Sequence, residues 1–195
     1  MAKGRPREFD IQEALDRALV IFWRKGYEGA SLPELTKAMG INRPSLYAAF
    51  GNKEALFRKT LDRYAAGPAA YIRESLGEPS ARAVFERLLR GAADSLTDPR
   101  YPPGCLMVHG ALKCAGAFDA VRKELASRRA GAEAAIRQRF EQAKRQGDWP
   151  TAMNPADLAR YITTIIQGMA VQAAGGASRR ELRRVAEVAI RAWPA

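Results

Sequence analysis

The chain has 195 residues and 47% of them are hydrophobic, which is enough to build a substantial core. Lys and Arg (32) outnumber Asp and Glu (21), and the formal charge of +11 favours a polyanionic partner with salt-dependent association. No apolar run approaches the roughly 20 residues of a membrane span, and the start lacks the apolar stretch of a signal peptide, so we expect a cytoplasmic protein without a membrane partner.

The first seven residues, MAKGRPR, form a basic segment with no apolar periodicity. Such a segment is expected to order only when an anion binds it. Lys3, Arg5 and Arg7 suit the minor groove of DNA, as in the arms that accompany some DNA-binding domains. An ordinary solvated terminus is the equal alternative.

A helix is predicted next. Asp10 and Glu13 have the spacing of a capping box, and apolar residues recur at helical spacing from Ile11 to Phe22. Gly26 is expected to end this helix.

Two short helices joined by a glycine turn are predicted in the following segment. Ser31 and Glu34 form a second capping box, and Gly40 allows the left-handed conformation that ends a helix. Asn42 then caps a helix over Arg43–Phe50. Two short helices about such a turn are the layout of a DNA-reading helix-turn-helix.

The second of these helices has one apolar and one polar face. Leu46 and Phe50, four residues apart, would anchor it to the core. The other face carries Arg43, Ser45 and Tyr47, residue types that bind base edges and phosphates. A small helical bundle whose exposed face is merely polar is the alternative.

The run GINRPSLYAAFGNKEALF, with FDIQEALDRALVIFWRKGYEGAS before it, resembles the signature of TetR-family transcriptional regulators over the first third of the chain. The resemblance implies that Tyr47 and Lys53 contact phosphates and that the residues from Asn42 to Ser45 approach bases. The complete predicted DNA-contacting set is Lys3, Arg5, Arg7, Ser31, Asn42, Arg43, Pro44, Ser45, Tyr47 and Lys53.

Beyond residue 52 the pattern is helical throughout, with no strand, repeat or low-complexity tract. We therefore predict an all-α protein with a helix-turn-helix DNA-binding domain over residues 1–52 and an effector-binding and dimerisation domain over residues 53–195. Further helices are predicted at 52–66, 80–96, 105–115, 118–144, from 154, and from 178, where Ser178 and Glu181 again form a capping box.

A homodimer is expected because a single recognition helix gives limited specificity, whereas a twofold dimer reads two half-sites. The resemblance implies that the last two helices form the interface. The predicted interface residues are Leu158, Ile162, Ile165, Ile166, Leu182, Val185, Ala189, Ile190 and Trp193. The alternative is that the same apolar stripes complete the core of one chain, and both can hold at different positions.

The resemblance also implies a pocket for a small apolar or electrophilic effector among the middle helices. The candidate lining is Tyr71, Phe85, Leu89, Cys105, Met107, His109, Phe118, Trp149, Tyr161 and Met169. Any one of these is more often plain core than a ligand contact, and this includes His109, the single histidine.

Cys105 and Cys114 are the two cysteines. Nine positions on one helix place them on opposite faces, which disfavours a bridge within that helix. Cys105 opens the predicted helix, where the positive helix terminus can lower the pKa of a thiol, and His109 lies one turn along on the same face. The segment GCLMVHGA resembles that of TetR regulators that respond to oxidants or electrophiles. A buried cysteine that acts as a small hydrophobe is the alternative.

An enzyme is not expected. The sequence contains no phosphate-binding loop, HExxH, paired CxxC or GxSxG motif, and one histidine excludes a histidine-based metal or catalytic cluster, so no cofactor or metal is predicted. The resemblance implies a repressor that a small molecule or a thiol-reactive signal releases from a palindromic operator. A transcriptional activator and a nonspecific architectural DNA-binding protein are the alternatives.

Overall fold

The fold was analysed on a computed structural model that describes residues 9–112, 119–150 and 153–193. These ranges contain ten α-helices and no strand, so the predicted all-α class is confirmed. Five residues that carried predictions lie outside the described ranges: the arm residues Lys3, Arg5 and Arg7, the second cysteine Cys114 and the pocket candidate Phe118. The helices are α1 (Ile11–Gly29), α2 (Leu32–Met39), α3 (Arg43–Phe50), α4 (Lys53–Ala66), α5 (Ala70–Ser75), α6 (Ala81–Ser95), α7 (Leu106–Leu112), α8 (Asp119–Arg145), α9 (Pro155–Ala174) and α10 (Arg179–Arg191).

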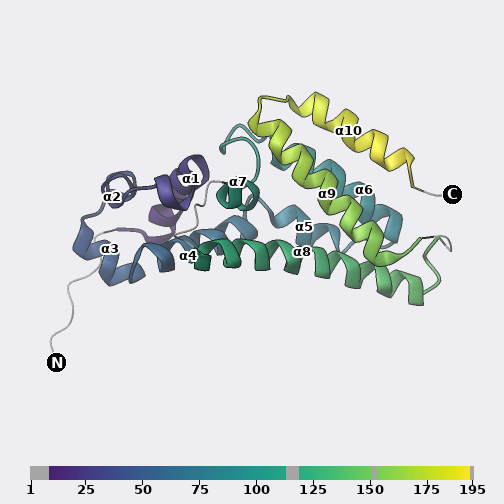
Figure 1. Cartoon of the computed structure of the whole chain (residues 1–195), viewed down its shortest axis with the longest axis horizontal. Coiled ribbons are helices and arrows are strands. Elements are labelled where there is room, and N and C mark those ends of the chain that lie inside the picture. The colour runs from purple at the N-terminus through teal and green to yellow at the C-terminus, as the bar shows by residue number, and fades with distance from the viewer. Residues whose placement is uncertain (1–8, 113–118, 151–152, 194–195) are drawn as a thin grey trace.

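The helices form an elongated molecule with α1, α2 and α3 gathered at one end and α9 and α10 towards the other (Figure 1). Helix α4 leads from the first group towards the centre, and the long α8 runs beneath α5 and α9 in this view. Within the part of the chain described, no helix is both long and apolar enough to cross a bilayer.

Two hydrophobic cores correspond to the two ends. The first joins α1 to α4 and includes Phe22, Leu35, Leu46 and Phe57. The second joins α6, α8, α9 and α10. Because α4 contributes to the first core, its packing belongs with the three preceding helices, and the predicted division between residues 52 and 53 stays a prediction.

The helix starts follow the predicted caps. The Ser31 and Ser178 hydroxyls accept hydrogen bonds from the amides of Glu34 and Glu181, and both glutamates return the bond to the cap residue, so these two capping boxes are confirmed. At the start of α1 the carboxylate of Asp10 accepts hydrogen bonds from the amides of residues 12 and 13. The Glu13 side chain does not return a bond to the cap amide, so Asp10 is an N-cap and the predicted capping box is not complete.

Helix α1 does not end at Gly26, contrary to prediction. Gly26 has φ +73° and kinks the helix, and a further turn reaches Gly29. The extra turn places Tyr27 in the core, where its ring stacks on Phe22 and meets Phe57 edge-on at a centroid distance of 5.2 Å. The burial of this aromatic ring explains why the chain resumes helix after the glycine.

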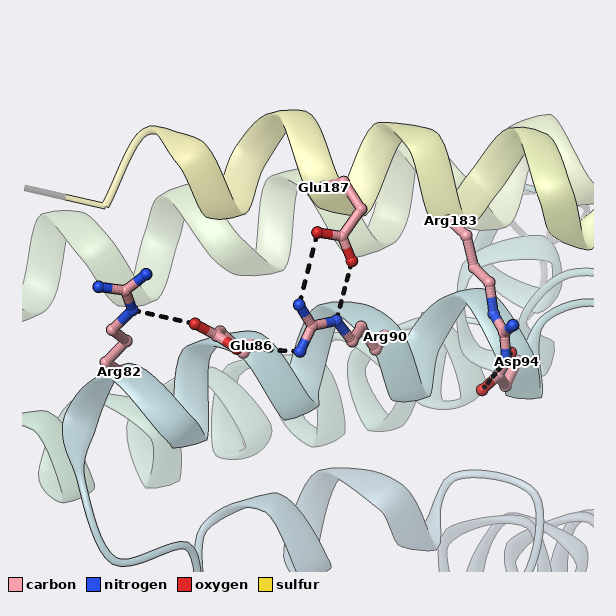
Figure 2. A network of polar contacts seen from close by, with 6 residues as sticks. All are labelled: Arg82, Glu86, Arg90, Asp94, Arg183 and Glu187. Atoms are coloured by element: carbon pink, nitrogen blue, oxygen red, sulfur yellow. Dashed lines mark hydrogen bonds and ion pairs between the residues drawn. The ribbon is translucent and has the colours of Figure 1, made fainter.

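Ion pairs hold α10 against α6 (Figure 2). Arg90 donates to Glu187 at 2.8 Å, and Arg183 donates two hydrogen bonds to Asp94 at 3.0 Å each. Glu86 pairs with Arg90 on the same helix. Exposed pairs of this kind contribute little stability one by one, about 0–1 kcal/mol. Their bidentate geometry fixes which face of α10 turns towards α6.

Gly40 offers a direct test of the turn between α2 and α3. Its φ of +69° suits glycine, so Gly40→Ala should lower the free energy of unfolding by about 1–2 kcal/mol. The control is Gly131→Ala in the interior of α8, where an added methyl group meets no atom within 4 Å. That substitution should stabilise the protein by about 0.5–1 kcal/mol. Urea unfolding of both variants measures the two effects. A change in the free energy of unfolding in the same direction for both variants would contradict the assigned turn.

Candidate DNA-reading helices and an adjoining cavity

The two helices that form the candidate reading unit are held in a fixed relation to α1. The Lys25 ammonium of α1 forms an ion pair with Glu34 of α2, the same carboxylate that caps α2. After the left-handed Gly40, the Ile41 amide donates to the Thr36 carbonyl at 3.1 Å. This hydrogen bond closes the turn, and α3 begins two residues later.

Helix α3 buries one face and exposes the other, as predicted. Leu46 and Phe50 lie in the first core, whereas Arg43 is exposed and Tyr47 is 46% exposed. The side chains of Arg43 and Tyr47 form no hydrogen bond or ion pair with another described residue. A guanidinium and a phenol are therefore both available to an external partner on the same face.

Three other predicted DNA contacts have structural roles within the chain. The Asn42 side chain accepts a hydrogen bond from the Ser45 amide at 2.9 Å, and the Ser31 hydroxyl takes part in its capping box. Pro44 lies exposed in the first turn of α3, where a missing amide hydrogen costs nothing. Their contact with DNA stays a prediction.

Lys53 lies in the first turn of α4, next to α1. Its ammonium is 4.6 Å from the centroid of the Tyr27 ring, in a cation–π contact. Partial burial lowers the pKa of Lys53, and the Glu28 carboxylate opposes this shift. The positive end of α4 and the ammonium together make this corner suitable for a phosphate.

Helix α4 is tied to α1 at its other end. Arg63 donates two hydrogen bonds, of 2.7 and 2.8 Å, to the carboxylate of Asp16. One residue on, the buried Tyr64 ring packs edge-on against Trp23 of α1 at a centroid distance of 4.8 Å. Tyr64 thus lies in the same core as Trp23 and as Leu46 and Phe50 of α3.

A cavity of about 430 Å³ lies between the two cores. This volume suits a small organic ligand. Ala65, Arg73 and Gln167 line it and are exposed, so it opens to solvent. The full lining is Tyr64, Ala65, Ala69, Tyr71, Ile72, Arg73, Leu76, Leu96, Cys105, Met107, Val108, Arg128, Arg129, Ala132, Ala135, Ile136, Thr163, Ile166, Gln167 and Ala170.

Cys105 connects the cavity to α4. The Tyr64 hydroxyl donates a hydrogen bond to the Cys105 sulfur at 3.2 Å, and the thiol is partly exposed. Burial raises the pKa of Tyr64 and of Tyr71, with a smaller contribution from Cys105 in each case, so both phenols stay protonated. The prediction that this helix opens at Cys105 is off by one residue, because α7 begins at Leu106 and Cys105 immediately precedes it.

Gly104 sets the position of this cysteine. It has φ +92°, and the His109 ring and the Ala170 carbonyl leave no space for a side chain there. His109 therefore packs against the backbone before Cys105, and it is not part of the cavity wall.

The cavity and the predicted pocket share three residues, Tyr71, Cys105 and Met107. Three predicted members, Phe85, Leu89 and Met169, are buried in the second core away from the lining. Trp149 and Tyr161 also lie outside the cavity: the Trp149 ring packs on Phe140, and Tyr161 is 43% exposed on α9.

Sequence reasoning missed the residues of α8 that form one wall. Arg128, Arg129, Ala132, Ala135 and Ile136 recur at the spacing of one helix face. Ala132 and Ala135, between Arg129 and Ile136 on this inward face, leave space unfilled, and their spacing is visible in the sequence. The spacing on α8 does not indicate which other helices enclose the cavity.

The predicted dimer residues divide into two groups. Most already lie in the core of the chain or pack against it; these are Leu158, Ile162, Ile165, Ile166, Leu182, Ala189, Ile190 and Trp193. Val185 instead is 45% exposed on α10. Other large apolar side chains exposed on the same two helices are Tyr161, Val171 and Val188.

The described residues contain no group of three or more His, Cys, Asp or Glu side chains arranged to hold a metal ion. The exposed face of α3 with the adjacent Lys53, and the cavity beside the Cys105 thiol, are the two candidate sites among the described residues.

Comparison with known proteins identifies both halves of the chain. The family model described as bacterial regulatory proteins, tetR family, matches residues 14–60. A second model, described as the tetracyclin repressor-like C-terminal domain, matches residues 79–189.

Individual relatives cover almost the whole chain. The HTH-type transcriptional repressor ComR of Escherichia coli K12 is 36% identical over 99% of this chain and 93% of its own length. The solved structure of a cysteine mutant of the TetR family regulator CifR, complexed with 26-base-pair operator DNA, is 43% identical, with a TM-score of 0.91 over 97% of this chain and 100% of that chain.

The cap of α2 predicts a specific pH dependence of stability. Hydrogen bonds from Lys25 and Ser31 lower the pKa of Glu34 from 4.5 to about 2 in the folded chain. A lowered folded-state pKa stabilises the fold above the ordinary pKa, and this contribution is lost as the pH falls towards the folded value. The free energy of unfolding should thus fall more between about pH 5 and pH 2 in the native chain than in Glu34→Gln. Urea unfolding across that range measures the difference, and parallel curves would contradict it.

Proposed function

Because the chain belongs to the TetR family of helix-turn-helix transcriptional repressors, we propose that it binds operator DNA as a homodimer and is released when a small apolar or electrophilic molecule occupies the cavity beside Cys105. The observation that carries this proposal is the contact between Tyr64 and Cys105, since it joins the cavity to the helix that follows the reading unit.

On DNA, α3 enters the major groove and Lys53 holds the adjacent backbone. Arg43, exposed at the start of α3, can reach base edges, and the Tyr47 hydroxyl can donate to a phosphate. The similarity to CifR, whose mutant was solved with operator DNA, supports this mode of binding.

The outward face of α9 and α10 is the proposed dimer interface. Val171 on α9 and Val185 and Val188 on α10 are between 45% and 60% exposed. The ion pairs to α6 occupy another face of α10, so these apolar side chains are left for a partner. A twofold pair joined here would present two copies of α3 to successive major grooves.

Release follows from the contacts of Tyr64. A ligand in the cavity, or an adduct on Cys105, competes for the space and the hydrogen bond at the thiol. Tyr64 packs on Trp23 of α1, so its displacement shifts α4 relative to the core that holds α3. The ligand favours the shifted arrangement and DNA favours the original one, which is the difference in affinity that allosteric release requires.

Two substitutions on α3 test the reading surface. Arg43→Ala should cost about 1–3 kcal/mol on the native site and less on a scrambled duplex, because a base contact is lost. Tyr47→Ala should weaken binding to both duplexes by a similar factor. Fluorescence anisotropy with DNA from upstream of its own coding region measures both.

The control for these variants is Arg137→Ala in the C-terminal half of α8, an exposed arginine paired with Glu141. It removes the same charge far from α3, so it should leave operator binding nearly unchanged. Equal losses in Arg43→Ala and Arg137→Ala would show that overall charge, and not the α3 surface, governs binding.

The thiol is tested separately. Treatment with N-ethylmaleimide should reduce the operator affinity of the native protein about tenfold or more, a coupling free energy of at least about 1.4 kcal/mol. Cys105→Ser should resist this treatment, and Cys114→Ser should respond like the native protein. Intact mass spectrometry reports which cysteine is alkylated. An unmodified Cys105, or an adduct without loss of DNA binding, would contradict the electrophile branch of the proposal.

A further inference from the structure

We propose that the cavity binds an amphipathic anion, an apolar body ending in a carboxylate, and that the Arg129 guanidinium is the anchor for the carboxylate. This inference rests on the proposed function, because it assigns a chemical class to the effector of the same cavity.

The wall of the cavity is mostly apolar. Aliphatic side chains from α5, α7, α8 and α9 contribute to it, and alanines widen it where α4 and α8 approach. Such a surface favours a hydrocarbon group, at about 25 cal/mol for each Å² removed from water. The body of the ligand is therefore apolar.

The charged residues of the lining have one sign. Arg73, Arg128 and Arg129 line the cavity, and no Asp or Glu is among the lining residues of the described chain. The positive charge of a cavity with this lining disfavours a cationic ligand and favours an anionic one.

Arg128 is already neutralised. It pairs with Asp62 of α4 at 2.7 Å and with Glu124 of its own helix at 2.7 Å. Two carboxylates satisfy this guanidinium without a ligand, and its pair with Asp62 also ties α8 to α4.

Arg129 differs from its neighbour. It is half-buried, and the acceptor it holds is the neutral carbonyl oxygen of Met107, at 2.7 Å from Nη1. No described carboxylate pairs with it. A guanidinium carries five N–H donors, and a partly buried cation without a counter-ion is costly. The Met107 contact fixes the guanidinium plane, so the other donors are arranged for a bidentate carboxylate.

The ligand orientation follows from these positions. Met107 follows Cys105 by two residues and both line the cavity. The carboxylate at Arg129 thus lies close to the α7 wall, and the hydrocarbon extends along the alanines of α8. Arg73, exposed at the opening, attracts the anion before it enters.

Direct binding to the full-length protein without DNA tests the inference. The probes are octanoate, 1-octanol and octylamine, which share a chain length and differ in charge. Isothermal titration should give octanoate about tenfold or higher affinity over 1-octanol, as expected of a charge-assisted hydrogen bond, and octylamine should bind weakest.

Variants identify the anchor. Arg129→Met should remove the preference for octanoate and leave 1-octanol within about twofold, while Arg129→Lys should keep part of the preference because it keeps the charge. Arg137→Met on the same helix is the matched control and should bind like the native protein. Far-UV circular dichroism confirms that each variant is folded.

Several results would overturn the inference. These are equal affinity for octanoate and 1-octanol in the native protein, an unchanged octanoate preference in Arg129→Met, or an equal loss of both ligands in Arg129→Met and Arg129→Lys, which would indicate a packing role. Octanoate that binds through Arg129 without releasing DNA would support the anion site and contradict the proposed release mechanism, so the two proposals fail separately.

Discussion

Helix α4 packs against α1 along its length, and the arrangement of the whole molecule depends on this contact. Lys53 lies over the Tyr27 ring at the start of α4. Near the end of α4, Arg63 donates hydrogen bonds to Asp16, and the adjacent Tyr64 packs against Trp23. The same helix offers Tyr64 to the cavity. Because one helix contributes to the DNA-binding core and to the cavity wall, the proposed release requires only a small change at the wall to shift the core.

Local rules predicted the helices well, because helix starts depend on residues close in sequence. Three-residue spacing was enough to predict the capping boxes of Ser31 with Glu34 and of Ser178 with Glu181. The position of Gly40 after an apolar helix face was enough to predict the turn. The kink at Gly26 is the exception. There the burial of an aromatic side chain against α4 outweighs a local stop signal, and that contact joins segments about thirty residues apart in sequence.

The cavity was harder to predict for the same physical reason. Its wall comes from helices spread over more than a hundred residues, and periodicity identifies an inward face without identifying what it meets. Large side chains such as Phe85 and Leu89 were predicted to line the pocket, but they pack in the second core, where they fill space. The hollow instead lies where Ala132 and Ala135 leave it unfilled, and its polar character comes from arginines such as Arg129, which the sequence alone does not distinguish from solvent-exposed ones.

Gly104 has a consequence for altering the specificity of this protein. The His109 ring and the Ala170 carbonyl fill the space where a side chain would be, so a larger residue there must displace the ring or the backbone of α9, beside the cysteine that lines the cavity. The alanines of α8 face the hollow and can be enlarged without such a shift. A programme of directed evolution aimed at the ligand preference of the cavity should therefore diversify the α8 wall and hold the glycine before the thiol constant.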